Sequence, residues 1–199
     1  MKPIDIGKAY NQITHLWTSD GFDRSNGIKQ HQKAITFVKN RGNALDIGCG
    51  CTGRFIELLS KEGFTPSGLD VSTETIKISR EKYPNFRFIH ADICEYEISE
   101  KYDFITAWDS IWHIPLYEQK LVLTKIVNSL NVGGVFIFSF GGTAEEGFHT
   151  DNFMGPEVYY SSLGTNGFLK LFIKLGCAIK HLEFDQYPEL HTYLIIEKT

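Results

Sequence analysis

The glycine-rich stretch at residues 44–53 constrains the fold of this chain more than any other feature. It reads as a short buried strand, a tight loop and the start of a helix near Arg54. Glycines at 48, 50 and 53 allow backbone angles closed to other residues and place no side chain in the way of a ligand. Free N–H groups at a helix N-terminus favour anionic groups. The stretch predicts a nucleotide-type pocket; a strand–helix turn without a ligand is the alternative.

Strand and helix patterns alternate through the hundred residues that follow. Alternation of this kind predicts a mostly parallel sheet with helices on both faces. The loops after the first four strands should then lie along one edge of the sheet, where ligands bind in such folds. The predicted strands of this part are residues 44–47, 65–70, 86–90, 103–108 and 135–140.

The two ends of the chain differ from this central part. Residues 1–40 show helical spacing and no strand pattern, and we expect them to form a helical lid. Residues 141–164 are glycine-rich, polar and aromatic, which predicts a long lid loop over the site. Residues 165–199 contain a helix and two strands whose connection is too short for a parallel crossover, so the strands should be antiparallel. We expect one domain, with its cofactor-binding core at 42–140.

Composition excludes several classes of protein. The 199 residues are 42% hydrophobic, enough for a full core, and the formal net charge of −4 with no basic block argues against nucleic acid as a partner. No stretch is apolar enough for a membrane span, and the N-terminus does not resemble a signal peptide, so a cytoplasmic location is expected. The spacing of the four cysteines fits neither a disulfide framework nor a metal site. The oligomeric state is left open.

Three acidic residues bear on the class of cofactor, and two of them distinguish between two classes. Asp70 follows the second strand and suits the ribose of either a nicotinamide dinucleotide or S-adenosylmethionine. Asp46 lies inside the first strand, where dinucleotide folds usually carry apolar residues, and a carboxylate there suits a cationic amine. Asp92 ends the third strand and can accept a hydrogen bond from the adenine amine, while the Ile93 N–H can donate to a ring nitrogen. The chain also leaves little room for the second domain of a dehydrogenase.

Five segments, in chain order, resemble the motifs of class I S-adenosylmethionine-dependent methyltransferases. They are Leu-Asp-Ile-Gly-Cys-Gly at 45–50, Gly-Leu-Asp-Val-Ser at 68–72, His-Ala-Asp at 90–92, Tyr-Asp-Phe-Ile at 102–105 and Asn-Val-Gly-Gly-Val-Phe at 131–136. The resemblance covers residues 42–140. It implies a Rossmann-like seven-stranded sheet, mostly parallel with an antiparallel last strand, and S-adenosylmethionine as the cofactor with S-adenosylhomocysteine as product.

The resemblance also implies where the cofactor binds. Gly48 and Gly50 would line its methionine portion, Asp70 would bind the ribose hydroxyls and Asp92 the adenine amine, and the main chain near Trp108 would contact the methionine end. The family usually has G-x-G-x-G, but the third glycine here is delayed to position 53, which leaves open which backbone groups contact the ligand. The predicted cofactor-binding residues are Asp46, Gly48, Gly50, Gly53, Asp70, Val71, Asp92, Ile93 and Trp108.

The segment after the fourth strand should lie beside the transferred methyl group. Methyl transfer from a sulfonium is an in-line displacement, in which a protein mainly aligns the reactants and excludes water. His113 is the candidate base or substrate ligand if the nucleophile arrives protonated; a histidine bound to main chain at a helix entry is the alternative. The predicted substrate-binding residues are Trp112, His149, Tyr159 and Tyr160, and Tyr10 and Trp17 are candidates to close the opposite side.

The sequence therefore predicts an S-adenosylmethionine-dependent methyltransferase that acts on a small molecule. Two alternatives stay open: a nicotinamide-dependent oxidoreductase, and a methyltransferase-like protein that binds the cofactor but only regulates a partner. No motif identifies the methyl acceptor, so oxygen, nitrogen and sulfur all remain possible acceptor atoms.

Overall fold

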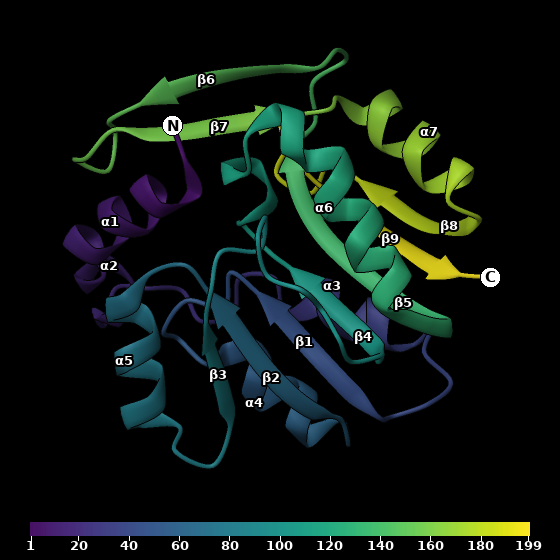
Figure 1. Cartoon of the computed structure of the whole chain (residues 1–199), viewed down its shortest axis with the longest axis horizontal. Coiled ribbons are helices and arrows are strands. Elements are labelled where there is room, and N and C mark those ends of the chain that lie inside the picture. Colours follow the sequence, from purple (N-terminus) through teal and green to yellow (C-terminus); the bar gives the residue numbers. More distant parts are fainter.

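A seven-stranded sheet forms the centre of the molecule in a computed structural model that describes residues 1–199 (Figure 1). The strand order is β3-β2-β1-β4-β5-β9-β8, and only β9 runs against its neighbours. The strands are β1 (Asn43–Ile47), β2 (Thr65–Asp70), β3 (Arg87–His90), β4 (Tyr102–Ala107), β5 (Leu130–Gly141), β8 (Cys177–Glu183) and β9 (His191–Lys198). The predicted fold class, a Rossmann-like sheet with an antiparallel last strand, is confirmed.

Helices cover both faces of this sheet. The helices of the alternating part are α4 (Arg54–Lys61), α5 (Thr73–Lys82) and α6 (Leu116–Ser129), and α7 (Thr165–Lys174) precedes the final strand pair. Ser72 caps α5 as the sequence predicts, since its hydroxyl accepts a hydrogen bond from the Thr75 N–H at 3.1 Å. No helix is long and apolar enough to cross a membrane.

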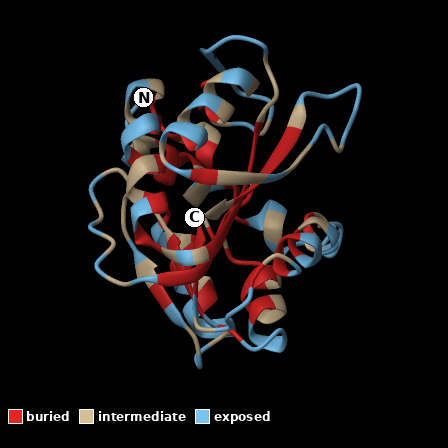
Figure 2. Cartoon of the chain, turned by 90° about the vertical axis from the view of Figure 1, so that its right-hand side faces the viewer, coloured by how far each residue is buried: buried red, intermediate tan, exposed pale blue.

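The alternation of side chains along β5 divides the core into two layers. Phe136, Phe138 and Phe140 pack with Phe168 and Phe172 of α7 and with the apolar face of α6. Val135 and Ile137 point the other way and pack with the aromatic and aliphatic residues of α3 and α4. Successive strand residues face opposite sides of a sheet, so β5 is buried on both faces and reads as a continuous apolar run. Figure 2 shows buried residues running through the sheet and exposed residues on the outer loops.

The N-terminal segment forms three helices: α1 (Pro3–Ile13), α2 (His15–Thr18) and α3 (Ile28–Ile35). Helix α1 lies against the loop that follows β2. A Cβ atom at Gly7 would lie only 2.7 Å from the carbonyl oxygen of Val71, so the close approach of α1 requires glycine at this position. Helix α1 thereby covers the carboxyl ends of the parallel strands.

The segment 141–164, expected to be an irregular lid loop, contains a β-hairpin instead. Strands β6 (Gly147–Asp151) and β7 (Val158–Ser162) pair antiparallel and form a second, two-stranded sheet. The ring of His149 stacks on that of Tyr160, at 5.1 Å between centroids, which stabilises the pairing. The glycine and polar content of residues 141–155 concealed a strand pattern that resides in the valine and tyrosines of β7. The hairpin packs on α1 through Tyr159.

Candidate functional site

The glycine loop between β1 and α4 is held by backbone bonds and by close packing. The N–H groups of Gly48 and Cys49 both donate to the carbonyl oxygen of Leu69, at 2.7 and 3.1 Å. Gly48 has φ of 71°, and a Cβ atom there would overlap the side chain of Ser110. Gly50 has φ of 56°, and a Cβ atom there would meet nothing within 4 Å. Of these two glycines, Gly50 is therefore the one that borders open space.

Asp70, at the end of β2, ties this loop to the next one. Its Oδ2 accepts a hydrogen bond from the Gly50 N–H at 2.8 Å, and its Oδ1 accepts one from the Ser72 N–H at 2.8 Å. Burial raises the pKa of this carboxyl group, although the two backbone bonds act in the opposite direction. A carboxylate has about four acceptor positions, so two remain for a ligand.

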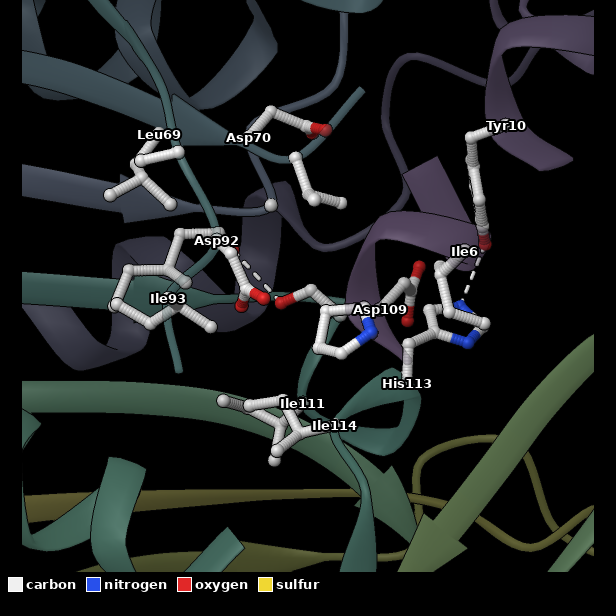
Figure 3. A pocket seen from close by; sticks show the side chains of 16 residues that line it. Ile6, Tyr10, Leu69, Asp70, Asp92, Ile93, Asp109, Ile111, His113 and Ile114 are labelled. Carbon is white, nitrogen blue, oxygen red and sulfur yellow. Dashed lines mark hydrogen bonds between the residues drawn. The ribbon is translucent and has the colours of Figure 1, made fainter. Parts of the chain in front are cut away.

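A first cavity of about 100 Å³ lies at the carboxyl ends of β1, β2 and β3. Figure 3 shows Asp92 and Ile93 toward one end of it, Tyr10 and His113 at the other, and Asp70 between them. Most of the remaining wall is aliphatic, and Pro3, Ile6 and Tyr10 of α1 close one side. The aliphatic wall residues are Ile47, Leu69, Val71, Ala91, Ile93, Ile111 and Ile114. Acidic groups spaced along an apolar slot suit a flat, polar-edged ring joined to a sugar.

A second cavity of about 350 Å³ adjoins the first. Tyr10, Gly48, Asp70 and Asp109 line both cavities, so the two meet at these residues. One wall of the second cavity is the glycine loop from Gly48 to Thr52, continued by Arg54. The other walls are largely aromatic: Tyr10, Trp17, Phe22, Phe55, Trp108, Trp112 and Tyr160.

Arg54 is a cation without an anionic partner. No carboxylate lies within 4.0 Å of its guanidinium, and its buried Nε atom has no hydrogen-bond partner. The guanidinium lies over the rings of Phe55 and Phe22, 4.5 and 5.1 Å from their centroids. Burial lowers the pKa of Arg54, while the more distant carboxylates of Asp109 and Asp46 oppose that effect. A buried polar group that lacks a partner is costly, so this side chain is suited to bind an anionic ligand group.

His113 is fully hydrogen-bonded in this structure. Its Nδ1–H donates to the carbonyl oxygen of Tyr159 at 2.9 Å, which fixes the tautomer because a carbonyl can only accept. Its Nε2 accepts from the Tyr10 hydroxyl at 2.7 Å and from the Trp112 indole at 3.0 Å. Burial lowers the pKa of His113 to about 4, so the ring is neutral at pH 7. The main-chain contact matches the structural alternative given for this histidine, although the ring also borders the first cavity.

The predicted site residues fall into two groups. Ten line one or both cavities: Gly48, Gly50, Asp70, Val71, Asp92, Ile93, Trp108, Trp112, His113 and Tyr160. Four do not line either: Asp46, Gly53, His149 and Tyr159. Gly53, with φ of 67°, begins α4 and packs on the ring of Tyr83. Its conformation is therefore explained by packing rather than by a ligand.

The other three residues outside the cavity walls have identifiable structural surroundings. Asp46 is 2% exposed beneath the glycine loop, and burial raises its pKa to about 7 while Arg54 acts to lower it. Tyr159 turns its hydroxyl to the Leu116 N–H, at 3.3 Å. His149 is exposed and stacks on the hairpin ring of Tyr160.

Asp109 and His191 are cavity residues that the sequence analysis missed. Asp109 has φ of 53°, the only positive φ among the non-glycine residues. Its Oδ1 accepts from the Ser139 hydroxyl and from His191 Nε2, each at 3.0 Å. Asp109 follows the fourth strand as Asp70 and Asp92 follow theirs, and that position was an available signal. His191 lies 82 residues further along the chain, and no local pattern indicates it.

Comparison with known proteins agrees with this architecture. The family described as "Methyltransferase domain" matches residues 44–134. An uncharacterized methyltransferase of Bacillus mycoides (strain KBAB4) is 25% identical over 202 residues, which cover 86% of this chain and 95% of the relative.

Solved structures share the fold at low sequence identity. PH0226 protein from Pyrococcus horikoshii OT3 superposes with a TM-score of 0.76 at 22% identity, covering 96% of this chain and 99% of the other. An S-adenosylmethionine-dependent methyltransferase from Clostridium acetobutylicum superposes with a TM-score of 0.72 at 16% identity, and the match covers 98% of each chain. CalS10, an amino pentose methyltransferase from Micromonospora echinaspora, superposes with a TM-score of 0.71 at 13% identity, and the match covers 90% of this chain and 93% of CalS10.

Proposed function

We propose that the chain is a class I S-adenosylmethionine-dependent methyltransferase, which transfers a methyl group from S-adenosylmethionine to a small-molecule acceptor. When bound, this cofactor supplies a methyl group already activated on a sulfonium. The work left to the protein is to bind, to align and to exclude water, which can contribute ~7–11 kcal/mol to lowering a barrier.

One observation supports the cofactor assignment above the others: Asp70 and Asp92, from the ends of neighbouring strands, line the same apolar slot. In the proposed site Asp70 accepts hydrogen bonds from the ribose hydroxyls, using the lone pairs that Gly50 and Ser72 leave free. Asp92 has one oxygen bonded to the Cys94 N–H at 2.8 Å, and its other oxygen is available to the adenine amine. Val71 and Ile93 line the same cavity and would hold the ring by apolar contact.

The second cavity suits the methionine portion and the acceptor together. The glycine loop offers open space at Gly50, and Arg54 offers a guanidinium that forms no ion pair and whose Nε has no hydrogen-bond partner, which suits the methionine carboxylate. The junction at Tyr10 and Asp109 is where the transferred methyl group would meet its acceptor. A base at Nε2 of His113 would first have to lose its bonds to Tyr10 and Trp112, so we propose that His113 holds the cavity wall instead.

The size of the second cavity supports a small acceptor. At about 350 Å³ it accommodates an amino-acid tail and one compact acceptor group. Sequence and charge give no basic surface for nucleic acid. Among similar folds, CalS10 is described as an amino pentose methyltransferase and KedS8 as a sugar N-methyltransferase, which is compatible with a small acceptor here.

A screen of metabolite pools with S-adenosylmethionine tests this proposal, with release of S-adenosylhomocysteine as the readout. We expect release above background with at least one pool of low-molecular-weight compounds, and none with nucleic acid. Tight cofactor binding without transfer to any pool would contradict catalysis and support the regulatory alternative. NAD binding in place of S-adenosylhomocysteine binding would support the oxidoreductase alternative.

A further inference from the structure

Asp109 is held in place by specific contacts. Its backbone N–H donates to the Ser139 hydroxyl oxygen at 2.7 Å, and the same hydroxyl donates to Asp109 Oδ1 at 3.0 Å. A positive φ is uncommon for a non-glycine residue, although Asp adopts it more readily than most, and the φ of Asp109 is 53°. Asp109 lines both cavities and so lies at their junction.

His191 lies between two carboxylates. Its Nε2 is 3.0 Å from Asp109 Oδ1 and its Nδ1 is 2.6 Å from Asp185 Oδ1. An ionised carboxylate only accepts, so both ring nitrogens must donate and the ring is cationic. Burial alone would lower the pKa of His191, but the two hydrogen bonds outweigh it and raise the pKa. Two carboxylates and one imidazolium give this network a net charge of −1, which acts on Arg54 in the same cavity only through space and without a direct ion pair.

That charge is available to a ligand at Asp109. Asp185 is nearly enclosed, with its side chain 6% exposed, and its other oxygen accepts from the Gln30 amide at 2.8 Å. Asp109 is 33% exposed, and no protein group donates to its Oδ2. Arg54 lines the same cavity, but no ion pair within 4.0 Å joins it to Asp109.

The walls around Asp109 favour an organic cation as its partner. Trp112, Trp108 and Tyr160 line this cavity, and their ring faces carry a negative quadrupole that attracts cations. An anionic acceptor would face the excess negative charge of the Asp185–His191–Asp109 network, and a neutral hydroxyl or thiol would leave that charge uncompensated. An amine gains from both the carboxylate and the aromatic faces.

We infer that the methyl acceptor is an amine whose nitrogen binds Asp109, so that the chain is an N-methyltransferase. The inference rests on the proposed function and adds the class of acceptor to it. His191 and Ser139 act as positioning residues that hold the Asp109 carboxylate at the junction of the cavities.

The amine arrives as an ammonium ion, and Asp109 Oδ2 accepts one of its protons, which frees the nitrogen lone pair. The lone pair forms the new N–C bond while the C–S bond breaks and its electron pair returns to sulfur. The methylated nitrogen is again cationic, and the proton on Asp109 passes to water, which restores the carboxylate for the next turnover.

Transfer of an isotope-labelled methyl group to the metabolite pools, followed by mass spectrometry of the products, tests the class of acceptor. We expect the label on nitrogen. Label mainly on oxygen, sulfur or carbon would overturn the inference and leave the proposed function intact. Absence of any labelled product, with or without binding of S-adenosylhomocysteine, would overturn both.

The variant Asp109→Asn tests the residue, because asparagine tolerates a positive φ but cannot accept the charge or the proton. We expect kcat/KM for the amine to fall ~10–100-fold. Calorimetry should show weaker amine binding to the S-adenosylhomocysteine complex, with S-adenosylhomocysteine affinity changed less than about threefold. Glu189→Gln, at an exposed position, is the matched control and should change neither kcat/KM nor the affinity for the amine or for S-adenosylhomocysteine.

Three results would overturn the role of Asp109. Unchanged kcat/KM and amine affinity in Asp109→Asn would remove it from the acceptor site. A loss of S-adenosylhomocysteine affinity of tenfold or more would assign it to the methionine amine. A selective loss of S-adenosylmethionine affinity, with S-adenosylhomocysteine affinity kept, would assign it to the sulfonium.

Discussion

The hydroxyl of Tyr10 lies 2.7 Å from Nε2 of His113, and this bond joins helix α1 to the segment after β4 across 103 residues of sequence. Tyr10 lines both cavities, and Ile6 from the same helix closes the first one. The cofactor cavity is therefore completed by a helix that precedes the sheet in the chain. Because α1 closes one side of the first cavity, the bond to His113 should influence both the stability of the protein and the exchange of a ligand.

Removing that hydroxyl tests the attachment of α1. In Tyr10→Phe, Nε2 of His113 keeps only the indole of Trp112 as donor, and we expect the free energy of unfolding to fall by about 1 kcal/mol. Amide hydrogen exchange in α1 should be faster in the variant than in wild type, whereas exchange in the sheet should change less. Tyr117→Phe, at an exposed tyrosine, is the control and should behave as wild type. Unchanged exchange in α1 would show that the bond does not hold the helix.

The buried neutral ring of His113 predicts a stability loss in acid. Its pKa is about 4 in the folded protein and ~6.5 when unfolded, so the unfolded state binds a proton first as pH falls. This contribution to stability is complete above pH ~6.5 and declines toward pH 4, by about 2 kcal/mol for a ring that keeps some solvent exposure. Denaturation of wild type and His113→Gln at pH 7 and 4.5 measures it. An equal loss of unfolding free energy between pH 7 and 4.5 in the wild type and in His113→Gln would contradict this assignment.

Two glycines of the loop should respond differently to alanine. Gly48→Ala combines a positive φ with overlap on Ser110, and we expect a loss of about 2–5 kcal/mol of unfolding free energy. In Gly50→Ala the added methyl group meets open space, so only about 1 kcal/mol of unfolding free energy should be lost. The methyl group would, however, enter the second cavity, where we propose that the methionine portion binds. Thermal unfolding and S-adenosylhomocysteine titration separate the two effects. Equal stability losses would mean that Ser110 can move aside.

Asp70 should contribute directly to cofactor affinity. Asp70→Ala is expected to weaken S-adenosylhomocysteine binding by roughly 1–3 kcal/mol, through lost charge-assisted hydrogen bonds to the ribose. Because the same change frees the Gly50 and Ser72 N–H groups, Asp70→Asn is the gentler comparison and Glu81→Gln the exposed control. An affinity equal to wild type in both Asp70 variants would remove this residue from the site.

Local patterns in the sequence predicted the framework well. The order of strands and helices in the seven-stranded sheet follows from apolar periodicity, and features such as the Ser72 cap are fixed by neighbours in sequence. The acids Asp70 and Asp92 were found because each ends a strand and parallel strands end at one edge. The hairpin at β6 and β7 was missed because its stability comes from cross-strand stacking and packing on α1.

The parts of the site that escaped prediction depend on distant contacts. Asp109 is held by contacts with Ser139 and His191, which lie 30 and 82 residues further along the chain. His191 reaches the cavity because β9 lies beside β5, a pairing that local periodicity does not encode. The reason for glycine at position 48 is likewise Ser110, which lies 62 residues further along the chain.

Calorimetric titration of the wild-type chain with S-adenosylhomocysteine, and in parallel with NAD, tests the cofactor assignment most directly. Two carboxylates that line one apolar slot, beside an open glycine loop, predict saturable one-to-one binding of S-adenosylhomocysteine and little heat with NAD. Saturable binding of NAD with no binding of S-adenosylhomocysteine would contradict the account.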